Sequence, residues 1–335
     1  MSQSVLILGS QGVLGSLLAD AFDQAGWTTT RSSRRSGAVP GIHHVDLTIP
    51  EALENVLDDV KPDLIVSSVP DASLTAERAV LRRGGLILNV STLAISDIRR
   101  LRAVPPSDHD GTVVVYAGIA PGLSNLIAAS LLAGHPEADE IEMAFTISAN
   151  SSTGPAAADS GYDELTAAAR YRTAVIPLPS PFGRTRCLGF GGPDYTGWLG
   201  PVAEGRTVSP YLCLTPRPIR YALLAANAAG LINRLPRQIA SAKPPATSSA
   251  ASTEPVAHWI AVRRNGALLA ARTIRCQGDY RSSAAITVLF ARALTETAVA
   301  SRPGVLFPEE AVTLDDLRPG LTSAGITISE EKLAR

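Results

Sequence analysis

The stretch from Ser4 to Arg35 constrains the fold of this chain more than any other. Val5 to Leu8 is a continuous apolar run, which is typical of a β-strand buried on both faces. Three glycines spaced GxxGxxG come next, and apolar residues then recur with helical spacing from Val13 to Phe22. A threonine-rich segment at 27–31 predicts a second strand. Strand, glycine turn, helix and strand in this order are the first unit of a doubly wound parallel sheet.

A glycine turn in this position is suited to the pyrophosphate of a dinucleotide. Glycines let the backbone approach the phosphates, and a helix N-terminus supplies free N–H groups and a partial positive charge. The spacing is a variant of the common GxGxxG fingerprint, and the strand and helix around it favour a phosphate site over a turn that serves packing alone. We expect cofactor contacts along the whole loop, which consists of Gly9, Ser10, Gln11, Gly12, Val13, Leu14 and Gly15.

The loop after the second strand indicates which dinucleotide binds. An NAD site uses Asp or Glu here to accept a hydrogen bond from the ribose 2′-OH, but this chain has no acidic residue between Asp23 and Asp46. Arginines and hydroxyls would bind a 2′-phosphate instead, through charge-assisted hydrogen bonds. The sequence therefore predicts NADP, with Arg31 best placed at the strand end and a solvated basic loop as the alternative. The expected contacts are Arg31, Ser32, Ser33, Arg34 and Arg35.

Further cofactor contacts are expected where the next three strands end, because strand ends line the ligand crevice of a doubly wound sheet. We expect the third strand to end at the adenine ring, the fourth at the middle of the cofactor and the fifth at the nicotinamide. An ordinary polar loop is the alternative reading of the fourth strand end. In strand order, the residues are Asp46 and Leu47, then Ser67, Ser68 and Val69, then Ser91 and Thr92.

Composition excludes several classes of function. The net charge of −1 gives no general attraction to nucleic acid or to an acidic membrane surface. The three cysteines are far apart, so we expect a reducing compartment, no disulfide framework and no metal site. The chain enters a strand within a few residues of Met1, so we expect no signal peptide and a cytoplasmic location. The longest uncharged stretch, 116–134, is broken by polar residues and proline and predicts no membrane span.

The alternation of strand and helix ends after Pro136. Segment 140–147 alternates charged and apolar residues, which predicts an antiparallel strand, and Asn265-Gly266 is a strong hairpin signal. We therefore predict an α/β chain: a Rossmann domain at 1–135, an inserted α+β domain with a separate mixed or antiparallel sheet at 136–280, and a C-terminal helix and tail at 281–335 that return to the first domain. The glycine-, proline- and tyrosine-rich stretch 151–218 predicts irregular functional loops.

With these elements placed, the chain resembles the saccharopine dehydrogenase-like oxidoreductases over nearly its whole length. The resemblance rests on YAGIAPGLSN at 116–125, similar to the family's GxxPGxxN turn, and on RPGVLFPEE at 302–310. It implies an NADP-binding Rossmann domain, an inserted domain that carries a small-molecule substrate, and a homodimer. It also implies reduction of an imine to an amine, or the reverse, without fixing the substrate.

Candidate residues for catalysis and substrate binding follow from the chemistry of hydride transfer, which needs an electrophilic carbon at the nicotinamide and a source of protons. Turn chemistry and core packing are the alternative roles of the candidate acids, and a solvated strand face is the alternative for the arginines. The candidate general acids are Asp194, Tyr195 and Tyr162. The candidate substrate contacts are Pro121, Gly122 and Asn125 in the turn, Arg184 and Arg186 as a carboxylate clamp, and Trp198.

Simple features of the sequence exclude two mechanisms of hydride transfer, while two other functions stay open. None of the tyrosines is followed by lysine four residues later, which excludes the Tyr-x-x-x-Lys pair of short-chain dehydrogenases. The chain has neither a His-x-x-x-His nor a Cys-x-x-Cys pair, so metal-assisted hydride transfer is not expected. An enoyl or ketone reductase of the same fold and a non-catalytic NADP-sensing regulator stay open as alternatives.

Overall fold

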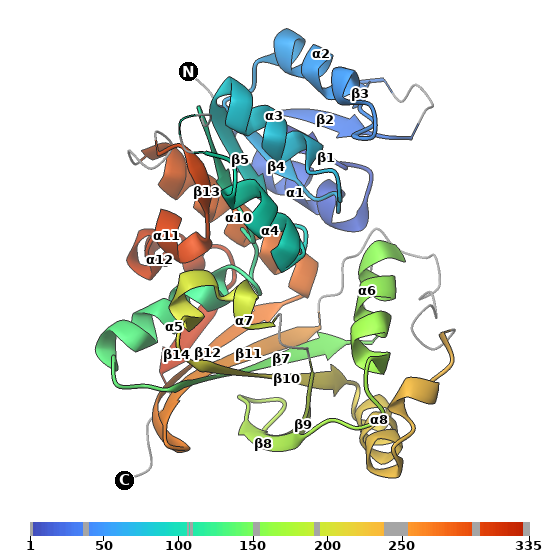
Figure 1. The fold of residues 1–335 in the computed structure, drawn as a ribbon, viewed down its shortest axis with the longest axis vertical. Coiled ribbons are helices and arrows are strands. Elements are labelled where there is room, and N and C mark those ends of the chain that lie inside the picture. The colour runs from blue at the N-terminus through green and yellow to red at the C-terminus, as the bar shows by residue number, and fades with distance from the viewer. Residues whose placement is uncertain are drawn as a thin grey trace. The chain divides into compact units, whose positions relative to one another are not determined.

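The computed structural model describes residues 3–35, 40–105, 107, 110–149, 155–190, 195–237, 254–296 and 302–330 (Figure 1). The chain forms two compact units. Unit 1 comprises Met1–Leu126 and Ser283–Ala324, and unit 2 comprises Ile127–Ser282 and Gly325–Arg335. Each unit is built on its own seven-stranded sheet, as the predicted fold class requires. Within the described residues, no helix is both long enough and apolar enough to cross a bilayer.

The sheet of unit 1 is parallel throughout, with the strand order β13-β6-β5-β4-β1-β2-β3. The order reverses between β1 and β4, which is the switch point where doubly wound sheets bind ligands. Its strands are β1 (Ser4–Leu8), β2 (Thr28–Ser33), β3 (Ile42–His44), β4 (Leu64–Ser67), β5 (Gly85–Asn89), β6 (Gly111–Val114) and β13 (Gly304–Leu306). Its helices are α1 (Val13–Gln24), α2 (Pro50–Val60), α3 (Thr75–Arg83), α4 (Ile95–Arg102), α11 (Pro308–Ala311) and α12 (Leu314–Leu321).

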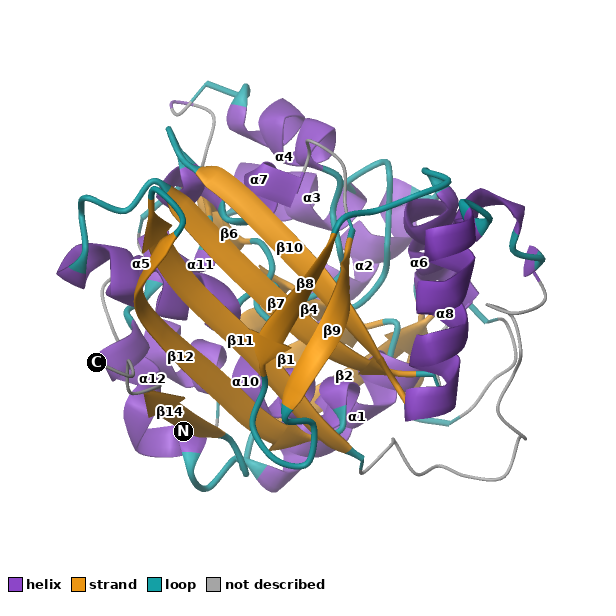
Figure 2. Ribbon diagram, turned by 90° about the horizontal axis from the view of Figure 1, so that it is seen from below, coloured by secondary structure: helices purple, strands orange, loops and turns teal. Residues whose placement is uncertain are grey.

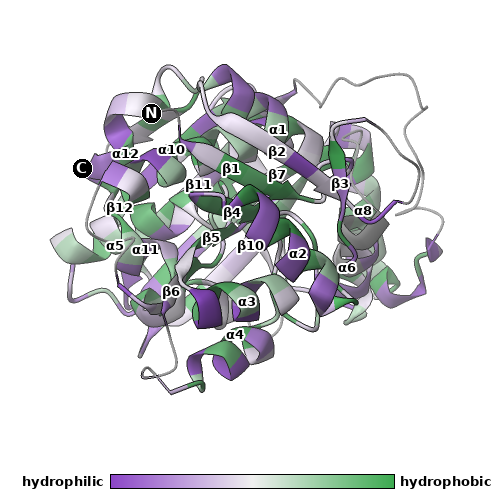
Figure 3. Cartoon of the chain, turned by 90° about the horizontal axis from the view of Figure 1, so that it is seen from above, coloured by the Kyte–Doolittle hydropathy of each residue, from purple (hydrophilic) through white to green (hydrophobic). Residues whose placement is uncertain are grey.

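Hydrophobic burial explains the centre of this sheet. The apolar residues of β1 are at most 1% exposed, so this strand is covered on both faces as its sequence predicts. Figure 3 shows β1 and β4 as hydrophobic strands and the threonine-rich β2 as a paler one. Helix α3 ends before Gly84, whose φ of 85° is a conformation that favours glycine. Strand β13 and helix α4 were not predicted, because each is too short to show a clear period.

The sheet of unit 2 is mixed, with the order β14-β12-β11-β7-β10-β9-β8 (Figure 2). Only β7 and β10 pair in parallel; the other described neighbours are antiparallel. Its strands are β7 (Glu140–Ser148), β8 (Thr173–Pro177), β9 (Arg184–Gly189), β10 (Thr207–Thr215), β11 (Pro255–Arg264), β12 (Ala267–Gln277) and β14 (Thr327–Glu330). Its helices are α6 (Pro155–Thr166), α7 (Tyr195–Trp198) and α8 (Arg217–Ala229), while α5 (Leu123–Gly134) and α10 (Asp279–Glu296) span the unit boundary.

The predicted hairpin is confirmed. Asn265 and Gly266 both have positive φ, 49° and 78°, and they join β11 to β12 as a two-residue turn. Strand β7 pairs antiparallel with β11, so the two segments share a sheet that is separate from the parallel one.

Two expectations about unit 2 are corrected. Much of 151–218 is regular rather than irregular, since α6, β8, β9, α7 and β10 all lie in it. Its prolines and glycines include Pro179 and Gly183, which turn the chain between β8 and β9. The expected return of the C-terminal segment to unit 1 applies to Ser283–Ala324, whereas β14 belongs to unit 2, where it pairs with β12.

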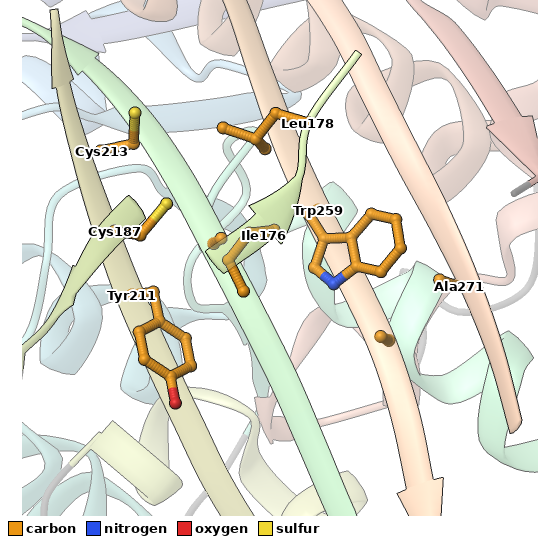
Figure 4. Packing of buried hydrophobic residues seen from close by; sticks show 9 residues of the cluster. Ile176, Leu178, Cys187, Tyr211, Cys213, Trp259 and Ala271 are labelled. Carbon is orange, nitrogen blue, oxygen red and sulfur yellow. The ribbon is translucent and has the colours of Figure 1, made fainter. Parts of the chain in front are cut away.

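The core of unit 2 gathers around Trp259, which is 1% exposed and donates its indole N–H to Glu142 over 3.2 Å. Figure 4 shows Trp259 on β11 and the side chains of Cys187 and Cys213 on the neighbouring strands β9 and β10. All three cysteines are buried free thiols, in keeping with the expected lack of disulfides. The buried members of this cluster are Ala144, Ile176, Leu178, Cys187, Tyr211, Cys213, Trp259, Ala261 and Ala271.

Candidate functional site

The glycine loop between β1 and α1 closes through two glycines that leave no room for a side chain. Gly9 has a φ of 82°, and a Cβ built on it would lie 2.7 Å from Cγ2 of Val69. A Cβ on Gly15 would lie 2.0 Å from the carbonyl oxygen of Gly9 and 2.9 Å from Oγ of Ser68. These two glycines are therefore required by the packing of α1 and of the β4 exit against the loop.

Gly12 is different, because its side-chain position is open. It lies at the N-cap of α1 in an extended conformation that any residue can adopt, and a Cβ would meet only the Gly9 carbonyl oxygen, at 3.2 Å. Among the described residues no side chain caps α1, and its first turn holds no acid. Free N–H groups, an uncompensated positive helix end and a bare backbone in front of it fit a phosphate group.

The serines of this region hold the loop against β2. Ser10 donates both its N–H and its hydroxyl to the carbonyl oxygen of Ser32, each over 2.9 Å, and Ser32 donates its hydroxyl to the carbonyl oxygen of Ile7 over 3.1 Å. Ser33 donates to Oε1 of Gln11 over 2.7 Å, which joins the loop to the end of β2. Ser10 and Ser32 are buried, and in this structure their hydroxyls hold the glycine loop against β2.

Arg31, the residue expected to be best placed for a 2′-phosphate, is engaged in two ion pairs in this structure. Its guanidinium pairs with Asp20 at 3.2 Å and Asp23 at 2.5 Å, two carboxylates on the outer side of α1. The prediction rested on the lack of acidic residues between Asp23 and Asp46. The two carboxylates that pair with Arg31 lie earlier in the chain, on α1. Arg34 and Arg35 follow β2, are exposed, and form no ion pair with the described residues.

The residues around the third and fourth strand ends also have mainly structural roles. The backbone N–H and hydroxyl of Thr48 bond to the Asp46 carboxylate, at 3.0 and 2.8 Å, and with nearby Arg34 they lower its pKa. Leu47 is buried, and its carbonyl oxygen accepts the hydroxyl of Thr75. At the fourth strand end, Ser67 is buried, Ser68 donates to the Leu8 carbonyl oxygen over 3.0 Å, and Val69 packs on Gly9.

At the fifth strand end, Ser91 and Thr92 differ. Ser91 donates its N–H and its hydroxyl to Oδ1 of Asn89, over 2.8 and 2.7 Å. Asn89 is fully buried and donates in turn to Glu77, whose pKa is raised by burial. Thr92 is exposed beside this anchored turn. A rigid backbone with an exposed hydroxyl at a strand end is compatible with the expected cofactor contact.

The two motifs that carry the family resemblance meet in unit 1. In the first, Asn125 accepts the N–H of Gly122 over 3.1 Å, and a Cβ on Gly122 would lie 1.9 Å from the Gly118 carbonyl oxygen. In the second, 184 positions along the chain, Glu309 accepts the Asn125 amide over 3.2 Å. Asn125 and Gly122 are buried and Pro121 is half-buried. The Asn125 side chain therefore stabilises the turn from inside the protein, and in this structure its amide is not exposed to a substrate.

Glu309 is a titratable group that the sequence analysis did not single out. It lies in α11, directly after β13, and its Oε1 has no hydrogen-bond partner among the described residues. Burial raises the pKa of its carboxyl to about 7. Arg102, which forms an ion pair with Glu310, lies 4.7 Å from the centre of the Phe307 ring and covers one side of this turn. The signal in the sequence was the PEE triplet itself.

The predicted catalytic and substrate residues in unit 2 lie on several elements, and the side chains of two of them fall outside the described residues. Tyr162 donates its hydroxyl to the Leu235 carbonyl oxygen over 2.6 Å, which is a structural bond. Arg184 and Arg186 are exposed on β9, in line with a solvated strand face. Trp198 is half-buried at the end of α7. Asp194 lies outside the described residues, and so does the side chain of Tyr195, which begins α7.

A buried histidine and an aspartate in unit 2, His258 and Asp279, also escaped the sequence analysis. Their signals were a lone histidine inside the apolar strand VAHWIAV and an acid directly after Gly278 at a helix start. In the parts of the chain that are described, no three His, Cys, Asp or Glu side chains are grouped to hold a metal ion.

Comparison with known proteins is consistent with a dinucleotide at the first unit. Residues 5–87 match the sequence model of the NAD dependent epimerase/dehydratase family. No curated protein matches the sequence. Among solved structures, homospermidine synthase from Legionella pneumophila in complex with NAD is 12% identical, with 99% of this chain and 91% of that one covered and a TM-score of 0.63.

Two other solved structures have a similar extent of coverage. C. glutamicum DAP dehydrogenase in complex with DAP is 14% identical over 95% of this chain and 98% of that one, with a TM-score of 0.50. An engineered D-amino acid dehydrogenase bound to NADP+ is 12% identical over 95% of this chain and 99% of that one, also with a TM-score of 0.50. At these identities the comparison shows a shared fold: this chain has the fold of NAD(P)-dependent dehydrogenases.

The first prediction tests the phosphate cradle. Gly12→Val places a branched side chain in front of the α1 N-terminus while meeting only one backbone atom. We expect NADPH affinity to fall by about 100-fold or more, equivalent to about 2.7 kcal/mol, because the phosphates lose their approach to the N–H groups. The free energy of unfolding should fall by no more than about 1 kcal/mol, the size of an N-cap effect. Fluorescence titration and urea unfolding measure the two quantities.

Gly15→Ala is the matched control, because its Cβ would collide with the Gly9 carbonyl oxygen. It should lower both stability and binding. Unchanged NADPH affinity in Gly12→Val would show that the phosphates do not lie on this loop.

The second prediction concerns Glu309 and pH. Its carboxyl keeps a proton up to about pH 7 in the folded chain but only to about 4.5 when unfolded. The folded state therefore binds more protons between these values, and the contribution of Glu309 makes stability fall as pH rises from about 4.5 to 7. In Glu309→Gln we expect a smaller loss of unfolding free energy between pH 5 and pH 8 than in the wild type, measured by urea unfolding. The variant Glu310→Gln, at the half-buried neighbour that pairs with Arg102, serves as the control, and equal pH dependence in Glu309→Gln and wild type would contradict the assignment.

Proposed function

We propose that this chain is an NADP(H)-dependent oxidoreductase that interconverts an imine and an amine on a small molecule. The observation that carries the proposal is the pairing of an open phosphate cradle at α1 with a basic strand end at β2, where the cofactor's adenosine ribose is expected. A bound reduced nicotinamide would supply a hydride to the substrate carbon. The residues of this chain that would hold the cofactor are Gly12, Val13 and Leu14 at the phosphates and Arg34 and Arg35 at the ribose phosphate.

The preference for NADP follows from charge. A 2′-phosphate carries close to two negative charges, and it would meet Arg34 and Arg35, two arginines that are exposed. The 2′-OH of NAD would need an acceptor at the same place. Asp20 and Asp23 are paired with Arg31, and the next acid after Arg35 along the chain, Asp46, already accepts two hydrogen bonds from Thr48. The structural neighbours include one bound to NADP+ and one in complex with NAD, so both chemistries occur in this fold.

The reaction class is suggested by the neighbours and by the turn that carries the resemblance. Two of the neighbouring structures are named as dehydrogenases of DAP and of D-amino acids, and the third as a homospermidine synthase. In this chain the GxxPGxxN-like turn is anchored by Asn125 and Glu309 at the carboxyl ends of β6 and β13. Substrate contacts beyond that turn, a homodimer and a cytoplasmic location are part of the same proposal.

The third prediction tests cofactor choice. The double variant Arg34→Ala with Arg35→Ala should weaken NADPH binding by about 30-fold or more while NADH binding changes little, because two charge-assisted hydrogen bonds to the 2′-phosphate are lost. The wild-type preference should also shrink as salt is raised, since both arginines are exposed. Titration of both cofactors at two salt concentrations measures this.

Arg31→Ala is the matched control for that experiment. Its guanidinium is held by Asp20 and Asp23, so its loss should change the ratio of NADPH to NADH affinity by less than about 3-fold, the range of a surface ion pair. Equal NADH and NADPH affinities in the wild type would refute the NADP assignment, whatever the variants do.

The fourth prediction tests the reaction class. We expect NADPH consumption with cyclic imines or with an amino acid plus an aldehyde, and an amine product by mass spectrometry. A conjugated enone and a simple ketone serve as parallel substrates. Turnover of these two alone would favour an enoyl or ketone reductase. Tight NADPH binding with no turnover of any of them would favour the sensing regulator.

A further inference from the structure

His258 is an imidazole in an apolar position with no partner for either nitrogen. It lies in the middle of β11, where it is opposite Phe145 of β7 and Ile274 of β12. The Phe145 ring packs against it with its centre 5.4 Å from that of the imidazole. The residue is 2% exposed, and neither Nδ1 nor Nε2 has a hydrogen-bond partner among the described residues. Buried polar atoms are nearly always hydrogen-bonded, so this histidine needs an explanation other than packing.

Asp279 is the acidic group next to it. Its Oδ1 lies 3.7 Å from Nε2 of His258, which is beyond hydrogen-bond length but close enough for a small movement to form the bond. Asp279 begins α10 directly after Gly278, whose φ of 71° turns the chain out of β12. The Asp279 side chain is 24% exposed whereas that of His258 is 3% exposed, so the carboxyl is the accessible end of the pair.

The groups that face His258 and Asp279 are uncharged near neutral pH, so the protonation of the pair depends mainly on its own burial. The facing residues on β7 and β12, Phe145 and Ile274, are uncharged. Cys276 of β12 is the other titratable group that senses Asp279, and burial raises the pKa of its thiol to about 12, which keeps it neutral. Burial lowers the pKa of His258 to about 4 and raises the pKa of Asp279 to about 7. Near neutral pH the imidazole is therefore neutral, while the carboxyl gains or loses a proton.

We propose that His258 and Asp279 form the proton-holding pair for the amine–imine substrate, with Asp279 as the group that exchanges the proton. The inference rests on the proposed function. In imine reduction the O–H bond of Asp279 breaks and the lone pair of the imine nitrogen forms the new N–H bond, which leaves an iminium ion and a carboxylate. His258 donates Nε2–H to that carboxylate as its charge appears. Water reprotonates the carboxylate through its exposed side, and amine oxidation runs the same transfer in reverse.

The pair differs from other histidine–acid pairs of this chain in a way that provides a control. His135 and Glu137 lie 3.4 Å apart at the surface, with side chains that are 35% and 38% exposed. Solvent screens the interaction of such an exposed pair. His135→Gln therefore removes a histidine with an acid neighbour but without burial.

The first experiment needs no substrate. The ring nitrogens of 15N-labelled histidines are followed by NMR from pH 4.5 to 9 in the wild type, Asp279→Asn, His258→Gln and His135→Gln, the last two serving to assign signals. We expect His258 to stay neutral above pH 5 and to show an inflection near pH 7 that reports Asp279 and is absent from Asp279→Asn. An ordinary titration of His258 near pH 6.5, or an inflection that persists in Asp279→Asn, would overturn the shared-proton pair.

The second experiment measures turnover of the imine found to be a substrate, across the same pH range. Asp279→Asn should lower kcat at pH 7 by about 100-fold or more, the usual size of general acid–base catalysis, and remove the inflection near pH 7. NADPH affinity should be unchanged, and His135→Gln should behave as wild type. Full kcat in Asp279→Asn would overturn the proposal. If NADPH binds and no imine is turned over, the proposed function fails and the substrate role of the pair fails with it, while the NMR titration still decides whether the pair shares a proton.

Discussion

The close approach of α1 to the end of β1 is the contact on which unit 1 depends. Gly15 lies so near the Gly9 carbonyl oxygen that any side chain would be 2.0 Å from it, and Ser68 and Val69 press on the same turn from the end of β4. The helix can start this close to the strand only because both positions are glycine. The same approach places the uncapped N-terminus of α1 at the end of β1, beside the switch point between β1 and β4 where the strand order reverses. Packing and phosphate binding are therefore separable here: Gly9 and Gly15 serve the first, and Gly12 is free for the second.

Cofactor discrimination in this arrangement depends on which arginines are already engaged. Arg31 lies in β2, and two carboxylates of α1 neutralise its charge. In this structure its ion pairs therefore connect β2 to α1. Arg34 and Arg35 directly follow β2, are exposed and form no ion pair with the described residues, so their charges are available to the proposed ligand. Ser33 connects this basic end to Gln11 in the glycine loop, so the ribose end and the phosphate end of the proposed site are joined by one hydrogen bond of 2.7 Å.

Local signals made the fold predictable, and long-range contacts limited what could be predicted of the site. The β1–α1–β2 unit and the Asn265-Gly266 hairpin are encoded in adjacent residues, and both were found from periodicity and turn chemistry. Strands β13 and β14 pair with β6 and β12, which are far away in the sequence. Residues close to these short strands therefore do not suffice to predict them. The ion pairs of Arg31 were not predicted, because its partners precede it on a helix. Asn125 and Glu309, like His258 and Asp279, become a pair only when the chain has folded. The motif residues were visible in the sequence, whereas the burial that changes their pKa was not.

The buried titratable groups act on stability in opposite directions, and this links the proposed chemistry to the energetics of folding. His258 binds a proton less well folded than unfolded, so its contribution to stability increases as pH rises from about 4 to its ordinary value of 6.5. Asp279 and Glu309 bind a proton more strongly folded than unfolded, so their contributions decrease as pH rises from their ordinary values of 3.8 and 4.5 to about 7. Asparagine or glutamine at the two acidic positions would remove those losses, because an amide needs no ionisation. The acids are therefore unfavourable for folding in the pH range where an enzyme that exchanges protons near neutrality requires a carboxyl that can lose its proton.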